Sequence, residues 1–89
     1  MANHIVIYTT PWCGYCSRAK RLLAGKRVAF HEIDLANTPD KRREMEQKSG
    51  RFTVPQIWIG DQHIGGCDEL HELEQRGQLD ALLGLTSRN

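Results

Sequence analysis

The sequence predicts an α/β domain in which helices flank a four-stranded mixed sheet, formed by a βαβ unit and a following ββα unit. The first observation is an apolar β-branched run, an amphipathic stretch and a second β-rich run over residues 4–34. Such a βαβ unit is expected to be right-handed with parallel strands. The second observation is a pair of short apolar runs around Gly60 and Asp61, which predicts a hairpin, followed by leucines at helical spacing.

The first unit begins with residues 4–9, whose nearly continuous apolar centre is typical of a buried strand, and Pro11 ends it. Residues 14–25 carry apolar side chains at helical spacing and basic side chains on the opposite face, so they predict an amphipathic helix. Residues 29–34 alternate in polarity and predict the second strand.

The segment between Thr38 and Gly50 predicts the second helix. Thr38 is a hydroxyl N-cap, Pro39 suits the first helical position, and Asp40 lies beside the positive end of the helix dipole. Gly50 supplies the stop. Met45 is the plainly apolar residue of this segment, so we expect this helix to be the most loosely packed element.

The second unit begins with the hairpin, whose strands are predicted over residues 56–59 and 62–64. The next helix is predicted over residues 68–76, where leucines recur at helical spacing. A glycine separates this helix from a last turn, residues 79–83, that is rich in leucine.

Length and charge restrict the function. At 89 residues the chain is short for a domain, so residues 1–89 are predicted to form one domain. The net charge of +1 supplies no field that would attract nucleic acid or an anionic membrane. The N-terminal residues carry no basic segment, and the apolar run of residues 5–7 is too short for a signal peptide or a membrane span. We therefore expect a soluble, cytoplasmic protein that binds neither nucleic acid nor membrane.

Cys13 and Cys16 lie between the first strand and the first helix, and this placement makes the Cys-x-x-Cys pair informative. At a helix N-terminus the Cys13 sulfur faces unpaired amide hydrogens and the positive end of the helix dipole, which both favour the thiolate over the thiol. Cys16 lies one turn further in, within reach of a disulfide. We therefore assign Cys13 as the nucleophile and Cys16 as the resolving thiol.

Three other interpretations of the cysteines compete with this assignment. A structural disulfide is disfavoured for two reasons: it would close a very short loop, and the small, odd number of cysteines indicates a reducing compartment. A zinc site would combine Cys13, Cys16 and Cys67 with His63 or His71, but the second half of the chain lacks a knuckle motif. Two buried, inert thiols would not explain a cysteine pair at a strand-to-helix corner.

Three segments together resemble the signatures of the glutaredoxin family, in order and with family-like separations. They are Thr-Thr-Pro-Trp-Cys-Gly-Tyr-Cys at residues 9–16, Arg-Phe-Thr-Val-Pro-Gln-Ile at residues 51–57 and Gly-Gly-Cys-Asp at residues 65–68. The chain is most similar in type to the small bacterial dithiol members. The resemblance implies a thioredoxin-like fold and a glutathione-dependent thiol–disulfide oxidoreductase that reduces protein–glutathione mixed disulfides and protein disulfides.

The resemblance also implies a site for glutathione as co-substrate. In the family the proline of the Thr-Val-Pro segment is cis, so the Val54–Pro55 bond is predicted to be cis and to lie beside the cysteine pair. The Val54 backbone would then pair with glutathione as with an antiparallel strand. The residues expected to bind glutathione are Tyr15, Arg42, Thr53, Val54, Pro55, Gly66, Cys67 and Asp68.

Several of these residues have a second interpretation. Asp68 is expected to pair with the ammonium of the γ-glutamyl group, and an N-cap role is compatible with this. Arg42 matches a basic helix position that holds the glycine carboxylate in the family, although its charge run is also typical of a solvated helix face. Tyr15 either contacts glutathione or covers the edge of the core. Trp12 is expected to flank the site, and Trp58 to pack on the sheet.

Two positions depart from the common family pattern. Thr10 stands three residues before the nucleophile, where the family often has a lysine, so a cation is missing there. Gly14 stands in place of proline, and some family members with a small residue there hold a [2Fe-2S] cluster across a dimer, ligated by one cysteine from each subunit and two glutathiones. The alternative function is therefore an iron–sulfur carrier or sensor with Cys13 as the cluster ligand. Otherwise we expect no metal, and a monomer that acts on glutathionylated or disulfide-bonded proteins.

Overall fold

The sheet has the predicted topology. The computed structural model describes residues 4–85 and contains a four-stranded sheet in the order β2-β1-β3-β4. The strands are β1 (Ile5–Thr9), β2 (His31–Asp34), β3 (Gln56–Ile59) and β4 (Gln62–Gly65). β1 runs parallel to β2 and antiparallel to β3, and β3 runs antiparallel to β4, so the predicted mixed sheet is confirmed.

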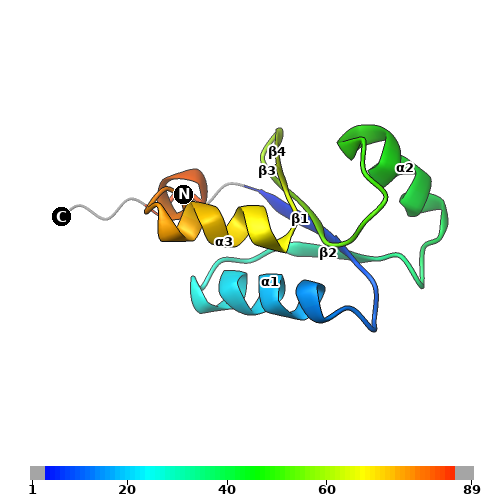
Figure 1. Ribbon diagram of the computed structural model, residues 1–89, viewed down its shortest axis with the longest axis horizontal. Coiled ribbons are helices and arrows are strands. Elements are labelled where there is room, and N and C mark those ends of the chain that lie inside the picture. Colours follow the sequence, from blue (N-terminus) through cyan, green and yellow to red (C-terminus); the bar gives the residue numbers. More distant parts are fainter. Residues whose placement is uncertain (1–3, 86–89) are drawn as a thin grey trace.

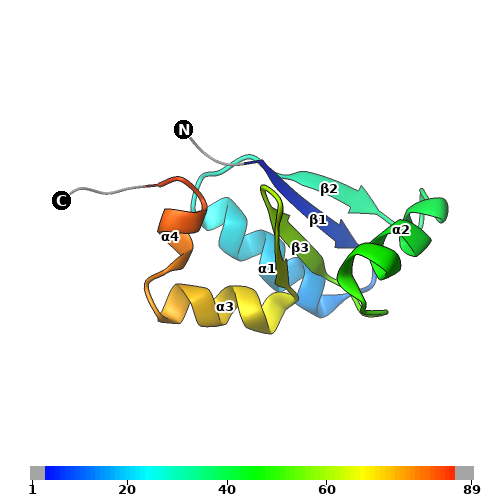
Figure 2. The ribbon, with the colours of Figure 1, turned by 90° about the horizontal axis from the view of Figure 1, so that it is seen from above.

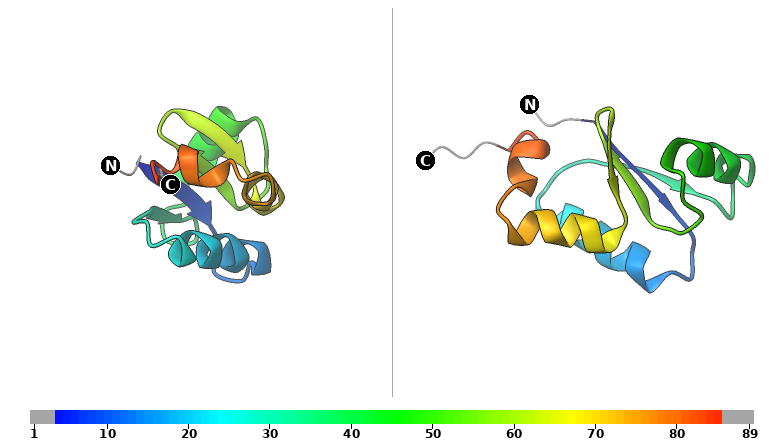
Figure 3. Two further views of the ribbon diagram at one scale, coloured as in Figure 1. Left: turned by 90° about the vertical axis from the view of Figure 1, so that its left-hand side faces the viewer. Right: turned by 45° about the horizontal axis from the view of Figure 1, so that its top comes forward.

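Helices cover both faces of this sheet. They are α1 (Gly14–Gly25), α2 (Asp40–Ser49), α3 (Cys67–Gln75) and the short α4 (Leu79–Leu82). Figure 1 shows α1 on one side of the strands and α2 on the other, and the views of Figures 2 and 3 show α1 and α3 side by side. None of the helices within residues 4–85 combines the length and the apolar content that crossing a bilayer requires.

The nearly continuous apolar run of β1 reflects burial on both faces. Because neighbouring side chains of a strand point to opposite faces, Ile5 and Ile7 join the core formed with α1, α3 and α4. Val6 and Tyr8 join the second core, where Met45 of α2 packs. Met45 is the single buried residue of α2, a helix that the structure describes in full, and this agrees with the sparse packing expected of it.

The structure corrects the predicted start of α2. Thr38 is not its N-cap, because the Thr38 hydroxyl donates to the carbonyl oxygen of Asp34 at 2.8 Å. Pro39 occupies the cap position without a side-chain hydrogen bond, and the helix begins at Asp40. The hydroxyl thus closes the turn that follows β2 and does not cap the helix.

Other boundaries shift by one or two residues. β2 begins at His31 and not at residue 29, because its ladder with β1 starts at the pair of Val6 and His31. β4 extends one residue further, to Gly65. α3 begins at Cys67, one residue before the predicted start, with Gly66 at the N-cap.

Candidate active site

The Cys13 sulfur lies at the N-terminus of α1, as predicted. Cys13 is the N-cap residue, with extended backbone angles (φ −112°, ψ 111°), and its Sγ accepts a hydrogen bond from the backbone N–H of Cys16 at 3.1 Å. The first turn of α1 holds no acidic residue. The Cys16 N–H and the positive end of the α1 dipole both point at this sulfur, and no acid in the first turn opposes them, so the site favours negative charge there.

Cys16 has a different environment. It is buried, with 1% of its surface exposed, whereas Cys13 is half-buried, and both thiols are free. Burial, with the hydrogen bond to Cys13, raises the pKa of the Cys16 thiol to about 12. Cys16 is therefore a protonated thiol at neutral pH, held one helical turn from the more accessible sulfur.

The segment before β3 packs against this sulfur. The Val54–Pro55 peptide bond is cis, as predicted. The Cys13 thiol donates to the carbonyl oxygen of Val54 at 3.7 Å, a distance suited to a sulfur donor. The Thr-Val-Pro segment and the cysteine pair therefore form one site.

A cavity of about 360 Å³ opens beside this contact. Its walls include every residue predicted to bind glutathione except Arg42. They also include a cation, Arg51, and an anion, Glu69, that the prediction did not contain. Its lining residues are Tyr15, Arg51, Thr53, Val54, Pro55, Gly66, Cys67, Asp68 and Glu69.

The start of α3 comes close to the cis-proline segment, and Gly66 allows this approach. A Cβ atom at Gly66 would lie 3.2 Å from the carbonyl oxygen of Pro55, closer than most such contacts, so one of the two backbones would have to shift slightly. Asp68 lies in the first turn of α3 and is not its N-cap. The α3 N-terminus and the cis-proline segment thus form two adjacent walls of the cavity.

Arg42 lies outside this cavity. Its Nη1 donates to the carbonyl oxygen of Phe52 at 3.4 Å and lies 3.9 Å from a carboxylate oxygen of Glu46, one turn along α2. The first contact places the guanidinium beside the segment that leads into Thr53. It does not bring Arg42 to the cavity wall.

Comparison with known proteins assigns the chain to a family. The family model described as Glutaredoxin matches residues 5–64. The chain is 60% identical over 79 residues to a glutaredoxin of Pseudomonas aeruginosa, a match that covers 89% of this chain and 94% of that relative. The chain belongs to the glutaredoxin family.

Further matches of this glutaredoxin agree with the motifs. It is 55% identical over 83 residues to glutaredoxin 3 of Escherichia coli strain K12, covering 93% of this chain and 99% of the relative. A buckwheat glutaredoxin–glutathione complex has a similar structure, with a TM-score of 0.85 at 34% identity, covering 92% of this chain and 77% of that chain. Because its Cys-x-x-Cys motif holds two thiols, Cys13 and Cys16, the chain is a dithiol glutaredoxin of thioredoxin-like fold, and a glutathione-dependent thiol–disulfide oxidoreductase.

The sequence interpretation missed two residues of the cavity, Arg51 and Glu69. Arg51 Nη1 lies 3.2 Å from Glu69 Oε1, and this oxygen also accepts from the backbone N–H of Gly66 at 2.6 Å. The hydrogen bond from Gly66, with Arg51, lowers the pKa of Glu69. One signal was present in the sequence, because a glutamate three residues after an N-cap has the spacing of a capping box.

The third cysteine forms part of the wall of the glutaredoxin site. Cys67 is 4% exposed, and burial raises the pKa of its thiol. Its Sγ lies 3.4 Å from Nδ1 of His71, which also lies 3.0 Å from the Cys67 carbonyl oxygen. Within residues 4–85, no three His, Cys, Asp or Glu side chains gather where they could hold one metal ion, so the zinc alternative has no assembled ligand set there.

Trp58 packs on the sheet, as predicted. It is 6% exposed and packs edge-on against Tyr8, with ring centroids 5.4 Å apart. Trp12, directly before the nucleophile, is 92% exposed. Tyr15 is also exposed and lines the cavity, so it lies at the site and not over the core.

Proposed function

We propose that Cys13 is the nucleophile of the glutaredoxin reaction. Its thiolate attacks the glutathione sulfur of a protein–glutathione mixed disulfide, so that a disulfide joins Cys13 to glutathione while the protein thiolate leaves and takes up a proton. The thiolate of a second glutathione then attacks the glutathione sulfur bound to Cys13. Glutathione disulfide is released and the Cys13 thiolate is restored.

Cys16 resolves the reduction of protein disulfides. Cys13 first forms a mixed disulfide with the client, and Cys16 attacks the Cys13 sulfur, releasing the client thiolate and leaving a Cys13–Cys16 disulfide. Two glutathiones reduce this bond. Because the Cys16 pKa is about 12, Cys16 must give up its proton as it attacks, which makes proximity to the mixed disulfide its main advantage.

The observation that carries the nucleophile assignment is the 3.1 Å hydrogen bond from the Cys16 N–H to the Cys13 sulfur. This hydrogen bond stabilises negative charge on the Cys13 sulfur, both when the thiolate attacks and when the sulfur leaves as a thiolate, because the same amide faces it in each step. Cys16 and Cys67 are buried, which leaves Cys13 as the accessible thiol of the described residues.

We place glutathione in the cavity beside this sulfur. A volume of about 360 Å³ suits a small ligand, and the walls offer backbone groups, an acid and a cation. No hydrogen bond among the described residues occupies the N–H of Val54, which is free to pair with the peptide. In this arrangement Asp68 pairs with the ammonium of the γ-glutamyl group, and Arg51 in the cavity wall pairs with a carboxylate of glutathione. Arg42 lies outside the cavity, where it contacts the carbonyl oxygen of Phe52.

The decisive assay follows reduction of a small glutathione mixed disulfide, with glutathione and its reductase in excess. The rate is expected to depend on glutathione, which separates this activity from that of a thioredoxin-type protein with another electron donor. Cys13→Ser is expected to abolish turnover, whereas Cys16→Ser retains deglutathionylation. An active Cys13→Ser variant would refute the assignment.

Cluster binding is the second candidate function, and Gly14 favours it. A Cβ at Gly14 would meet no atom within 4 Å, so the start of α1 is uncrowded beside Cys13. One chain would supply the Cys13 thiolate, and the other ligands would come from a second copy and two glutathiones. Anaerobic purification distinguishes the outcomes, since a brown dimer with visible charge-transfer absorption supports the cluster and a colourless monomer excludes it.

The partners follow from this chemistry. We expect glutathione and glutathionylated or disulfide-bonded proteins as partners, a monomer in the cluster-free state, and a cytoplasmic location where glutathione keeps thiols reduced. Size-exclusion chromatography with light scattering measures the oligomeric state of the cluster-free protein directly. A stable cluster-free dimer would contradict it.

A further inference from the structure

A fully buried amide lies directly behind the cavity wall. Gln56 is the first residue of β3, and its side chain is 0% exposed. Its Nε2 donates to the carbonyl oxygen of Thr53 at 3.1 Å and to the Thr53 hydroxyl at 3.3 Å. Its Oε1 lies 2.7 Å from Nε2 of His63 on β4. A buried amide needs such partners, because an unpaired polar group in the core is costly.

The direction of each hydrogen bond in this chain follows from the Thr53 carbonyl. A carbonyl oxygen only accepts, so the nitrogen of the Gln56 amide must face Thr53 and the oxygen must face His63. His63 Nε2 therefore carries the proton. Burial, together with the positive charge of Arg51, lowers the pKa of His63, while Glu69 opposes this shift. The ring is consequently a neutral donor at neutral pH.

The His63 ring is held in place from one side. It lies on Trp58, its cross-strand neighbour, with ring centroids 4.6 Å apart and planes inclined by 31°. Trp58 is itself fixed by its edge-on contact with Tyr8. Because the ring rests on buried core side chains, its Nε2 has a defined position relative to the Gln56 amide.

We propose that His63 is a positioning residue for the glutathione cavity. Through Gln56 it engages the Thr53 carbonyl from the protein interior and so fixes the Thr53–Val54 backbone in the orientation that forms the cavity wall. His63 does not line this cavity, whereas Thr53 does, so its effect passes through the buried amide. This inference rests on the proposed binding of glutathione in that cavity.

Steady-state kinetics with a glutathione mixed disulfide tests the role. His63→Phe keeps a ring against Trp58 but removes the donor, and we expect KM to rise about threefold to tenfold, the worth of one hydrogen bond. We expect kcat to stay within about twofold, because the sulfur chemistry is unchanged. His63→Gln, whose amide nitrogen reaches the same oxygen, should restore KM, and His31→Phe on exposed β2 is the matched control.

Three kinetic results would overturn the proposal. They are an unchanged KM in His63→Phe, a fall in kcat without a rise in KM, and an equal rise in KM in His63→Phe and His63→Gln. The last result would mean that restoring the donor does not restore binding, so the hydrogen bond to Gln56 would not be what positions Thr53.

A second measurement is independent of turnover and of the variants' folding. Nitrogen-15 NMR of the unmodified protein should show His63 with Nε2 protonated and Nδ1 unprotonated at neutral pH, and the reverse tautomer would contradict the hydrogen-bond chain. If the unmodified protein shows no glutathione-dependent turnover, the proposed function fails, yet this spectrum still tests the His63–Gln56 contact.

Discussion

The Cys13 sulfur and the Val54 carbonyl oxygen lie 3.7 Å apart although the two residues are separated by 41 positions in the sequence. Cys13 belongs to the βαβ half of the chain and Val54 to the segment that opens the ββα half. The pairing of β1 with β3 in the middle of the sheet brings the two halves together. The nucleophile and the wall of its cavity are therefore positioned by the same antiparallel ladder.

The three thiols should differ sharply in reactivity. Iodoacetamide at neutral pH is expected to label Cys13 and to leave Cys16 and Cys67 unmodified, because both are buried and burial raises the pKa of each. Peptide mass spectrometry identifies the labelled residue, and the same reaction in denaturant, where all three should react, is the control. Equal labelling of Cys16 in the folded protein would contradict the environments described for the pair.

The two candidate cations for glutathione can be ranked by substitution. Arg51 lines the cavity and Arg42 does not, so Arg51→Met should raise KM for a glutathione mixed disulfide about threefold to tenfold, the effect of losing one charged hydrogen bond partly exposed to water. Arg42→Met should change KM by less than about threefold. A larger effect for Arg42→Met would assign the glycine carboxylate to Arg42 on α2, the position that the family resemblance implies.

The Glu69 carboxylate should stabilise α3 in a pH-dependent manner. Its pKa is lowered by the Gly66 N–H and Arg51 from the ordinary value of 4.5, so its stabilisation is present above that pH and is lost as the pH falls through the lowered value. Glu69→Gln keeps the cap geometry without the charge and should cost on the order of 0.5 kcal/mol at neutral pH. Urea unfolding should show this difference shrinking in acid, and a difference that grows there would reverse the assignment.

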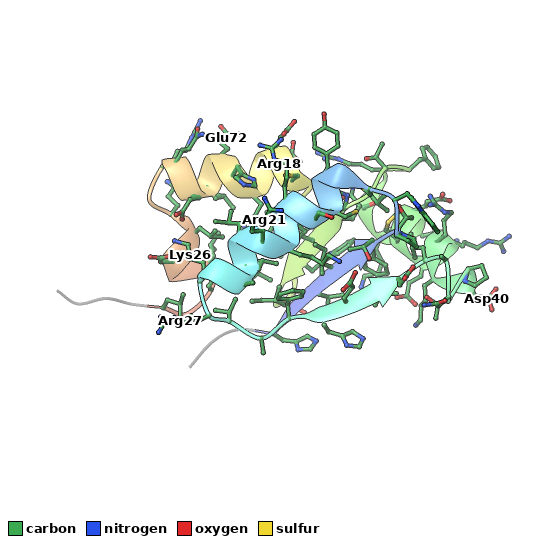
Figure 4. The ribbon with its side chains drawn as sticks, turned by 90° about the horizontal axis from the view of Figure 1, so that it is seen from below. Arg18, Arg21, Lys26, Arg27, Asp40 and Glu72 are labelled. Carbon is green, nitrogen blue, oxygen red and sulfur yellow. The ribbon has the colours of Figure 1, made fainter. Side chains whose placement is uncertain are left out.

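Lys26 connects three helices and should matter more than an ordinary surface lysine. Figure 4 labels Lys26 at the end of α1. Its Nζ lies 2.7 Å from Asp80 of α4 and 2.7 Å from Glu74 of α3, and its side chain is 18% exposed. Lys26→Met should lower the free energy of unfolding by about 1–2 kcal/mol, because it leaves two carboxylates without their shared cation.

The matched control for Lys26 is Lys20→Met. Lys20 pairs with Glu32 alone at 2.9 Å, with both side chains about a third exposed, so about 0.5 kcal/mol is expected. The carboxylates of Asp80 and Glu74 raise the pKa of Lys26 above 10.5, so its contribution holds below that pH and declines as the pH rises through the raised value. Equal losses for the two variants would show that the bridge to α3 and α4 adds nothing.

The sequence alone determined the features that depend on local pattern. Periodicity gave β1, α1 and the β3–β4 hairpin, because side chains repeat with the period of the element that they form. The Cys-x-x-Cys motif after a strand placed Cys13 at a helix N-terminus, and the motif resemblance placed the cis bond before Pro55. The structure confirms these features because each one is specified by residues close together in the chain.

Only the tertiary structure decided which side chains from distant segments meet. It placed Arg51 and not Arg42 in the cavity wall, turned the Thr38 hydroxyl towards Asp34, and joined His63 through Gln56 to Thr53. It also buried Cys16 deeply enough to raise its pKa to about 12. These outcomes depend on strand register and on the packing of helices against the sheet, and such contacts between remote residues leave no periodic trace in the sequence.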